Sequence, residues 1–513
     1  MDYKNSPYFH VAHARDLTGR DRVIYRLLEI LPGFLSWGTF LAIILCSIFI
    51  PVQTAIFIIA FDLYWLLKTI HLSYHHYYNW RRLKHNSQMN WYEMLQNMKF
   101  EHLQHLVILP YYKEGIEVVD ETIQSLVSSQ YKLKKLLIVL AAEQRAGSEA
   151  IEIANVMKAK YEKYFGDFII TIHPANLPNE IKGKGPNIAY ASEEARKLIL
   201  DRQGIKYEDV MVSAFDIDTV IWPQYFACLT WHFLTAEDPY NKSYQPVPLY
   251  NNNIWHAPAL SRVAAITSTF WQMIQQERPE KLATFSSHSI PFKSLYEVGY
   301  WQKNMISDDS RIFWNLFAAK DGNYAVVPIA YPVSMDANLA PTLFGTLKNI
   351  YKQHFRWMWG VENIPYMLFS FIKNKNIHWK QKLSKSFTQL VGFWSLATNP
   401  IMILVLGWLP IFLGGNEFRT TILSYNLPIV TRTLLMIAMA GVIFAAIVSA
   451  SLLPPMPKEL KRRKFRWFTM TFQWLFVPFT IIIFGSFPGL HAQTRLMLGK
   501  YVGAFWVTPK HRK

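Results

Sequence analysis

Two carboxylates one residue apart, Asp216 and Asp218, follow a run of uncharged residues at 210–215. On an extended backbone, positions i and i+2 point the same way, so both side chains would converge at the end of a buried strand. Two hard oxygen ligands at this spacing suit Mg²⁺ or Mn²⁺, which usually keeps waters and also binds a substrate's phosphates. A polar strand end that runs into a turn gives the same pattern, and a lone D-x-D is common, so the rest of the chain must decide.

The elements that would position these carboxylates lie between residues 100 and 340. Short apolar runs alternate there with polar or amphipathic stretches of helical length, which predicts an α/β domain with a mostly parallel sheet. In such sheets ligands bind beyond the carboxyl ends of the strands. The predicted strands are 106–109, 136–140, 168–172, 210–215 and 324–327.

Further candidate residues follow the other predicted strands. Tyr112 and Glu114 come after the first strand, and Glu143 comes after the second. After the third, residues 182–187 read Lys-Gly-Lys-Gly-Pro-Asn, which predicts a flexible basic loop that brings ammonium groups such as that of Lys184 to phosphates. It is not a Walker loop, because the glycine spacing is wrong and no Gly-Lys-Ser/Thr is present.

A second acidic pair, Asp308 and Asp309, lies between Ser307 and Ser310 and opens a helix-like stretch, 311–320. Ser and Asp are good N-cap residues, so a purely structural role for this pair is open. One residue of the pair can cap the helix while the other does chemistry.

The composition is that of a protein partly embedded in lipid, because 51% of the residues are hydrophobic and only 17% are charged. The net charge of +17 does not indicate nucleic acid, since basic residues cluster beside apolar segments, where the positive-inside rule and anionic lipid place them. We expect the loop 414–427 to be external and the basic loop 455–466 to be cytoplasmic. The apolar segments of spanning length are 31–50, 52–72, 389–413, 430–453 and 467–488.

One carboxylate, Asp62, lies close to the middle of the second apolar segment. A charge at that depth is costly and usually faces a bundle interior or a polar path. Local pairing with Lys68 or His71, one or two turns further on, is an equally good interpretation.

A helix-length amphipathic segment after residue 341 contains Gln353, His354, Phe355, Arg356 and Trp357. Its tryptophans and tyrosines are typical of an interfacial helix at headgroup depth, which is one interpretation of the segment.

Taken together, these residues resemble the membrane-embedded family 2 glycosyltransferases, which include cellulose, chitin and hyaluronan synthases. That group has three separated acidic sites followed by Q-x-x-R-W. Here Asp216 and Asp218 match the D-x-D, and the later acidic pair and residues 353–357 follow in order. Residues 184–187 are similar to the family's K-A-G-N loop, and residues 505–510 match the F-x-V-T-x-K gating motif of bacterial cellulose synthase. The resemblance covers roughly residues 100–510.

The resemblance implies a GT-A fold and inverting transfer from a nucleotide-diphospho-sugar, with UDP the expected nucleotide, to a glycan or lipid-linked acceptor. It implies that the enzyme extends a glycan at the membrane and passes it through its own helices. Mg²⁺ or Mn²⁺ is the expected cofactor and the lipid bilayer an expected partner. The resemblance implies that Asp218 and Asp216 bind the metal, and that Asp309, or alternatively Asp308, is the general base. It implies that Gln353 and Trp357 bind the acceptor. The residues implied to bind the donor are Tyr112, Glu114, Glu143, Lys184, Asp216, Arg356, Phe505, Thr508 and Lys510.

The sequence departs from the family pattern in two places, since Glu143 stands where the family usually has Asp, and Lys113 stands where it usually has Asn. Cellulose synthase's further helices and its cyclic-nucleotide-sensing domain have no counterpart after Lys510, so a cellulose product is not carried over. Two other interpretations are a non-processive enzyme that adds one sugar to a lipid, and a non-catalytic membrane transporter or scaffold.

The expected organisation contains a conflict. Three C-terminal spans after a cytosolic domain would leave residues 505–510 on the far side of the membrane, away from the nucleotide. One apolar segment must therefore be re-entrant or only interfacial, or else a fourth crossing is hidden. We expect 467–488 to be the segment that does not cross, because its prolines and glycines can break a helix, and 491–501 to run along the surface as a short amphipathic helix. The expected parts are a cytosolic segment 1–29, a helical hairpin 30–72, the GT-A domain 73–340, interfacial helices 341–384, a transmembrane bundle 385–490 and the gating segment 491–513.

Overall fold

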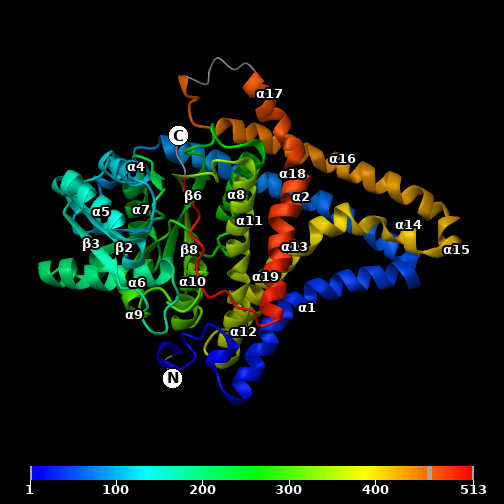
Figure 1. The fold of residues 1–513 in the computed structure, drawn as a ribbon, viewed down its shortest axis with the longest axis horizontal. Helices are drawn as coiled ribbons and strands as arrows, with labels where there is room; N and C mark the ends of the chain where they lie inside the picture. Colours follow the sequence, from blue (N-terminus) through cyan, green and yellow to red (C-terminus); the bar gives the residue numbers. More distant parts are fainter. Residues whose placement is uncertain (1–2, 459–464, 511–513) are drawn as a thin grey trace.

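The structure is a computed structural model that describes residues 3–458 and 465–510. An α/β domain lies on one side, and long helices extend away from it on the other (Figure 1). The expected fold class, an α/β domain with a mostly parallel sheet joined to a helical transmembrane bundle, is confirmed. Much of the predicted basic loop 455–466, and the basic residues 511–513, lie outside the described residues.

The sheet has eight strands in the order β3-β2-β1-β4-β7-β6-β8-β5. Six of these strands run in one direction, and β5 and β7 run against them. The central strands are buried on both faces, which is why they read as continuous apolar runs. The strands are β1 Gln104–Tyr111, β2 Leu136–Glu143, β3 Asp167–His173, β4 Val210–Ala214, β5 Val220–Ile221, β6 Lys242–Tyr250, β7 Ser289–Pro291 and β8 Ala325–Met335.

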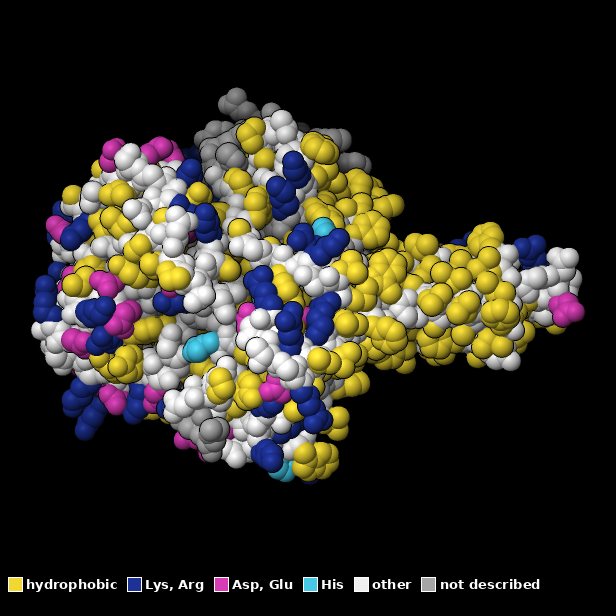
Figure 2. Space-filling view, turned by 60° about the horizontal axis from the view of Figure 1, so that its bottom comes forward, with side chains coloured by type: hydrophobic (Ala, Val, Ile, Leu, Met, Phe, Trp, Pro, Cys, Tyr) yellow, Lys and Arg dark blue, Asp and Glu magenta, His cyan; other side chains and the backbone are white. Residues whose placement is uncertain are grey.

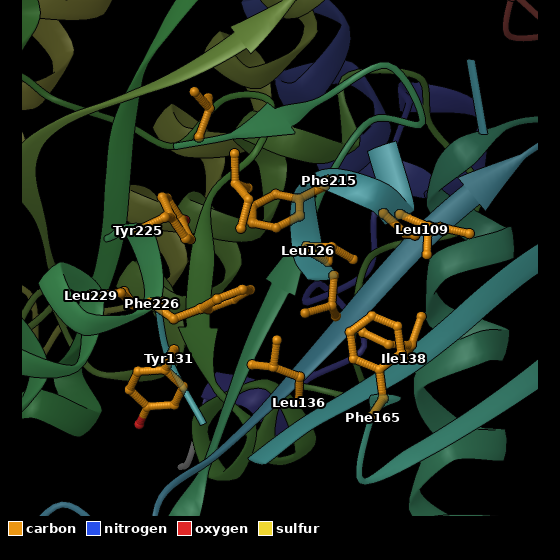
Figure 3. Close-up of a cluster of buried hydrophobic side chains, with 14 of the residues drawn as sticks. Leu109, Leu126, Tyr131, Leu136, Ile138, Phe165, Phe215, Tyr225, Phe226 and Leu229 are labelled. Carbon is orange, nitrogen blue, oxygen red and sulfur yellow. The ribbon is translucent and has the colours of Figure 1, made fainter. Parts of the chain in front are cut away.

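Helices cover both faces of the sheet. On one face, apolar side chains of β1, β2 and β4 pack against three helices, and Figure 3 shows part of this core around Leu109, Leu126 and Phe226. The other face packs against a second set of helices, one of which begins with the acidic pair Asp308 and Asp309. The first set is α4 Ile116–Val127, α5 Ser148–Tyr161 and α7 Tyr225–Thr235, and the second is α6 Lys184–Ala195, α9 Phe292–Glu297 and α10 Asp308–Ala319.

Four long helices form a protrusion whose surface is largely apolar (Figure 2). Five helical segments of the described chain are long and apolar enough to cross a membrane, four of them in this protrusion, so the chain is an integral membrane protein. Lys and Arg side chains gather beside the base of the protrusion, as expected for the side facing anionic lipid (Figure 2). The four helices are α1 Gly19–Phe49, α2 Pro51–Gln88, α13 Trp379–Leu404 and α16 Ile422–Ser451.

The far end of the protrusion is where the chain turns back twice. Pro51 is the first residue of α2, where its missing N–H is tolerated. Gly414 lies against it, because a Cβ at that position would come within 2.6 Å of the Pro51 Cβ. Two short helices, α14 Leu409–Leu413 and α15 Gly415–Arg419, make the second turn and contact the α1–α2 hairpin. Asp62 on α2 is 4% exposed and lies against Thr431 of α16, so the prediction that it faces the bundle interior is confirmed.

The fifth segment runs across the other helices (Figure 1). It starts beside α8, Ala259–Gln276, where Gln473 Oε1 accepts a hydrogen bond of 2.7 Å from Arg262 Nε. It ends beside the N-terminal part of α1, where Arg26 Nη1 donates to the Leu496 carbonyl at 2.9 Å. Both ends therefore lie on the side of the α/β domain. The segment consists of α17 Phe465–Phe472, 3₁₀ helix Gln473–Phe476, α18 Val477–Ile481, π-helix Ile482–Ser486 and α19 Phe487–Met497.

This crosswise segment is one of the five helical segments that are long and apolar enough to cross a membrane, so our expectation that 467–488 does not cross stays a prediction. Pro478, Gly485 and Pro488 do not end the helical segment. Gly485 lies in its π-helix, and each proline lies in the first turn of the α-helical piece that follows the 3₁₀ helix or the π-helix. One face exposes an apolar stripe that includes Phe476, Phe479, Ile483 and Phe487. The chain then leaves α19 and runs extended along the sheet domain toward the site.

Two more helices and the N-terminal segment pack against the α/β domain. The amphipathic helix α11, Leu343–Met358, contacts α19, and α12, Asn363–Lys373, contacts α1 and α10. Residues 3–17 are held on these elements, for example by Tyr366 Oη donating to the Phe9 carbonyl at 3.0 Å. Arg311 of α10 donates to the Val11 carbonyl at 3.1 Å, which connects the N-terminal segment to the helix of the acidic pair.

Candidate active site

The candidate residues gather at one edge of the sheet. Because six strands share a direction, the carboxyl ends of β1, β2, β4, β6 and β8 meet there, and the antiparallel β7 begins there. The loops after these strands contribute most of the polar groups of the site. They carry Tyr112, Glu114, Glu143, Asp216, Asp218, Asn252 and Asp336, while Ser286 and His288 precede β7.

The two carboxylates of the D-x-D lie in a turn and not on extended backbone. The strand β4 ends at Ala214, and the Thr219 N–H donates to the Asp216 carbonyl at 2.9 Å. Asp216 and Asp218 consequently bind different partners, and our argument from strand periodicity was wrong about the geometry. They still lie at one site, because Lys510 interacts electrostatically with both.

Lys184 lies between two carboxylates. Its Nζ donates to Asp216 Oδ1 at 2.7 Å and to Asp309 Oδ1 at 2.8 Å, and the side chain is 7% exposed. Burial alone would lower the pKa of Lys184, but Asp216 and Asp309 outweigh it and hold the pKa above its usual range. Burial alone would likewise raise the pKa of Asp216, but Lys184 and a hydrogen bond from Ser286 Oγ hold it well below its usual range.

The prediction of a flexible basic loop at 182–187 was wrong. Gly183 is extended and precedes α6, whose first residue is Lys184. Pro186 falls in the first helical turn, where proline is tolerated. The lysine is therefore buried at a helix start and positioned by the fold.

The acidic pair at the start of α10 divides into two environments. Asp309 is 26% exposed and faces Lys184, whereas Asp308 is 3% exposed. Burial and the neighbouring Asp309 raise the pKa of Asp308 to about 8, so it holds a proton at neutral pH. Ser307 precedes the helix, but its hydroxyl donates to Glu362 Oε1 at 2.9 Å and does not cap it.

His288 stands beside Asp309, with 3.8 Å between Nδ1 and Oδ1. Burial lowers the pKa of this imidazole, and Nδ1 lies 2.7 Å from the Phe285 carbonyl, to which it donates. Nε2 is buried and has no hydrogen-bond partner within the described residues. The histidine is thus neutral, with an unused acceptor.

Asp218 is fully buried and forms an ion pair with the C-terminal segment. Lys510 Nζ donates to Asp218 Oδ2 at 2.6 Å, and the Asp336 N–H donates to the same oxygen at 2.9 Å. Asn252 joins the two loops, because its Nδ2 donates to the Asp218 carbonyl and to Asp336 Oδ1, each at 3.0 Å. Burial alone would lower the pKa of Lys510, but Asp218 and Asp336 keep it above its usual range.

A divalent ion fits this corner chemically. Asp218 and Asp336 offer hard carboxylate oxygens, and the Lys510 ammonium shows that a cation is stabilised there. Among the described residues no three His, Cys, Asp or Glu side chains form a closed metal cage. Mg²⁺ and Mn²⁺ commonly take their remaining ligands from water and substrate phosphates. Asp216 is less available, since both its oxygens already accept hydrogen bonds.

The C-terminal segment crosses the site and contacts two of the predicted motifs. The Phe505 N–H donates to the Lys182 carbonyl at 2.9 Å, and a Cβ on Gly183 would lie 2.5 Å from the Phe505 Cβ. The Arg356 guanidinium lies 4.2 Å from the centroid of the Phe505 ring. Thr508 is buried, and its hydroxyl has no hydrogen-bond partner in the described structure.

The remaining residues of the Q-x-x-R-W motif have distinct partners. Gln353 Oε1 accepts from Asn338 Nδ2 at 2.6 Å, and the Trp357 ring lies 5.8 Å from that of Tyr250. Arg356 Nε is buried without a hydrogen-bond partner within residues 3–458 and 465–510. An unsatisfied buried donor of this kind suits an anionic ligand.

A third group of residues lies after β1 and β2. Arg145 pairs with Glu143 and stacks on Tyr112, with its guanidinium carbon 4.4 Å from the ring centroid. Glu114 Oε2 accepts from the Tyr112 N–H at 2.8 Å, and burial raises the pKa of Glu114. The structure thus joins the three predicted residues and adds Arg145, which lies two residues after Glu143 and could have been chosen on that ground.

The sequence analysis missed Ser286, His288, Asn252 and Asp336. Asp336 directly follows β8, so the rule that polar groups gather after parallel strands would have found it. We placed the end of that strand at residue 327, whereas it runs to Met335. The other three lie in loops around antiparallel or proline-containing strands that were not predicted, and no motif marks them.

Residues 211–453 match the family model described as glycosyl transferase family group 2. The matched range includes Asp216, Asp218, Asp309 and Arg356, and leaves β1–β3 and the C-terminal segment outside. No curated protein matches the chain.

Two solved structures show weak likeness. The mannosyltransferase PcManGT from Pyrobaculum calidifontis, in complex with GDP-Man and Mn²⁺, is 11% identical with a TM-score of 0.40, over 84% of this chain and 100% of that chain. Residues 1–349 of S. aureus TarS, in complex with UDP-GlcNAc, are 11% identical with a TM-score of 0.34, over 68% of this chain and 91% of that chain. Neither likeness is strong enough to carry an argument about this chain.

Proposed function

We propose that this membrane protein is an inverting glycosyltransferase of family 2 that uses a nucleotide-diphospho-sugar, with UDP the expected nucleotide, to extend a glycan on the side of its α/β domain. The observation that carries the proposal is the gathering of acidic and cationic groups at the carboxyl edge of the sheet, where Asp308 and Arg356 each have a buried polar atom without a hydrogen-bond partner among the described residues. The match of residues 211–453 to the glycosyl transferase family group 2 supports it.

In this proposal the diphosphate of the donor binds between Arg356 and the C-terminal segment. Arg356 has a buried N–H that no group of the described residues accepts, and Lys510 carries an ammonium group that pairs with Asp218. Charge-assisted contacts of these groups would stabilise the negative charge that the leaving nucleotide gathers. A divalent ion held by Asp218 and Asp336 would supply Lewis-acid stabilisation of the same charge.

Asp309 is the proposed general base. It forms an ion pair with Lys184 at 2.8 Å and is more exposed than Asp308, so it is the carboxylate of the pair that an acceptor hydroxyl can reach. It would take the proton of that hydroxyl as the oxygen attacks the anomeric carbon. Asp216 and Lys184 would hold Asp309 in position and orient the donor sugar, and Trp357 would offer an aromatic face to the acceptor.

The test uses purified protein incubated with UDP- and GDP-sugars, with and without EDTA, measuring nucleotide release and product length. We expect one sugar donor to be consumed with a product longer than one unit. Asp218→Asn and Asp309→Asn should each reduce turnover by roughly 10²-fold or more, and Asp309→Asn should leave donor binding intact. The control is Asp238→Asn, an exposed position before β6 whose left-handed backbone (φ 50°) asparagine also accepts.

The outcomes separate the alternatives. A product with a single added sugar on a lipid would favour the non-processive enzyme. The absence of nucleotide release with every donor would favour a transporter or scaffold. Full activity of Asp218→Asn in the presence of EDTA would contradict the metal, and full activity of Asp309→Asn would contradict its role as base.

A further inference from the structure

A groove lies between α11 and α19, outside the catalytic edge of the sheet. It has a volume of about 440 Å³ and is lined by Phe344, Lys348, Tyr351, Lys352, Phe355 and His491. Ligand pockets in proteins have volumes of roughly 300–1,000 Å³, so this groove is large enough for the polar part of a small molecule. None of the functions proposed above uses it.

The groove continues the apolar surface of the membrane-facing helices. On α19 and the segment before it, the exposed stripe of Phe479, Ile483 and Phe487 reaches His491 at intervals of four residues. On α11, Phe344 is 77% exposed at the helix start, one turn before Lys348. Each helix therefore presents apolar side chains toward one end of the groove and polar side chains toward the other.

The polar end of the groove is cationic. Lys348 and Lys352 are exposed, and neither forms an ion pair with a carboxylate of the described residues. Arg495, one turn after His491, lies near Phe355, with its guanidinium carbon 5.9 Å from the ring centroid. Tyr351 Oη and His491 Nδ1 lie 3.2 Å apart between the lysines and the membrane-facing stripe, within hydrogen-bonding distance.

We propose that this groove binds the phosphate headgroup of an anionic phospholipid from the surrounding bilayer. The two ammonium groups complement the phosphate, and the exposed Phe344 and Phe487 lie where the acyl chains would enter the hydrocarbon. A soluble anion would use the lysines but would gain nothing from the apolar end. A zwitterionic lipid carries the same phosphate, but its own cationic group offsets that charge, so it would gain less from the lysines. The proposal does not depend on the sugar-transfer function.

The groove contacts the C-terminal segment of the active site. Lys352 Nζ lies 5.1 Å from the centroid of the Trp506 ring, and Arg356, one turn further along α11, stacks on Phe505. A lipid phosphate at Lys352 would therefore lie next to the segment that places Lys510 on Asp218. Bound lipid would affect how firmly that segment is held.

The test measures binding of short-chain phosphatidylglycerol, below its critical micelle concentration, to the full-length protein in uncharged detergent. A lysine near an anionic lipid surface increases the affinity for that lipid roughly fivefold. The double variant Lys348→Gln/Lys352→Gln removes two such lysines and should weaken the affinity by roughly 30-fold. Lys375→Gln/Lys380→Gln removes the same charge from exposed positions outside the groove and should bind like the unmodified protein. Phe344→Gln should weaken phosphatidylglycerol binding without adding a charge.

Phosphatidylcholine of the same chain length and inorganic phosphate serve as competing probes. The proposal predicts that phosphatidylglycerol binds at a saturable site, and that neither competitor displaces it at equal concentration. Equal binding of phosphatidylcholine, equal competition by inorganic phosphate, or unchanged binding by a folded Lys348→Gln/Lys352→Gln variant would overturn it. The thermal midpoint of each variant shows whether it is folded.

Discussion

Removal of the Lys184 ammonium is the sharpest test of how the site is held together. In Lys184→Met the carboxylates of Asp216 and Asp309 lose the cation that lies 2.7 and 2.8 Å from them. Breaking a buried ion pair by removing one partner costs about 3–5 kcal/mol. Here the side chains of Asp216 and Asp309 are 30% and 26% exposed, so water solvates both carboxylates partly. We therefore reduce the expected loss of stability to about 2–3 kcal/mol.

This free energy is measurable as a shift in thermal unfolding. For a domain of 150–250 residues, 1 kcal/mol corresponds to about 2–4 °C, so the midpoint of Lys184→Met should fall by roughly 4–12 °C. The measurement is tryptophan fluorescence during heating, in detergent with EDTA and without donor. Lys293→Met is the matched control, because Lys293 pairs with Glu208 at 3.0 Å but both side chains are more than 40% exposed. It should shift the midpoint by about 2–4 °C at most.

A second substitution checks the reason for the shift. In the Lys184→Met background, Asp216→Asn removes one of the two uncompensated charges and should recover part of the lost stability. If Lys184→Met unfolds at the same temperature as Lys293→Met, the lysine does not hold the two carboxylates together. If Asp216→Asn lowers the midpoint further in that background, repulsion between the carboxylates is not the cause.

Three further predictions follow from the same structure. With its pKa of about 8, Asp308 keeps a proton in the native state that the unfolded chain loses near pH 4. The stability of the protein in EDTA should therefore fall as pH rises from about 4 to 8. Asp308→Asn should reduce this pH dependence, measured as the midpoint of thermal unfolding. Tyr501 donates to Glu29 at 2.7 Å and stacks on His13 at 4.0 Å, so Tyr501→Ala should raise KM for the donor several-fold with little change in kcat. An unchanged KM would show that this anchor does not position the C-terminal segment. Asp62→Ala should shorten the glycan while the first transfer continues, and unchanged product length would contradict a glycan path beside Asp62.

Much of the sheet and several acidic residues could be predicted from the sequence, because each predicted strand carries an apolar run, and Glu114, Glu143 and the D-x-D come after such runs. The strands that escaped prediction contain prolines or are very short. β6 contains Pro246 and Pro248, which normally argue against an interior strand. The structure accommodates them with a register shift between Gln245 and Val247 where β6 pairs with β8.

The candidate site was predictable as a set of residues but not as a set of contacts. Nothing in the sequence shows that Lys184 would be buried between Asp216 and Asp309, because those three residues come from three separate elements. The pairing of Lys510 with Asp218 spans 292 positions of the chain. The sequence analysis required residues 505–510 to lie on the same side of the membrane as the α/β domain. Only the structure shows that the crosswise helix ends where these residues can reach Asp218.

The contact between the two ends of the described chain has a consequence for biosynthesis. Tyr501 is held by His13 and Glu29, and the residues that follow it reach Asp218. During translation the α/β domain can fold as a unit as soon as it leaves the ribosome. Lys510 arrives only after α13, α16 and the crosswise helix have been made and inserted. A nascent chain whose membrane helices fail to insert would therefore carry a site without the Lys510–Asp218 ion pair.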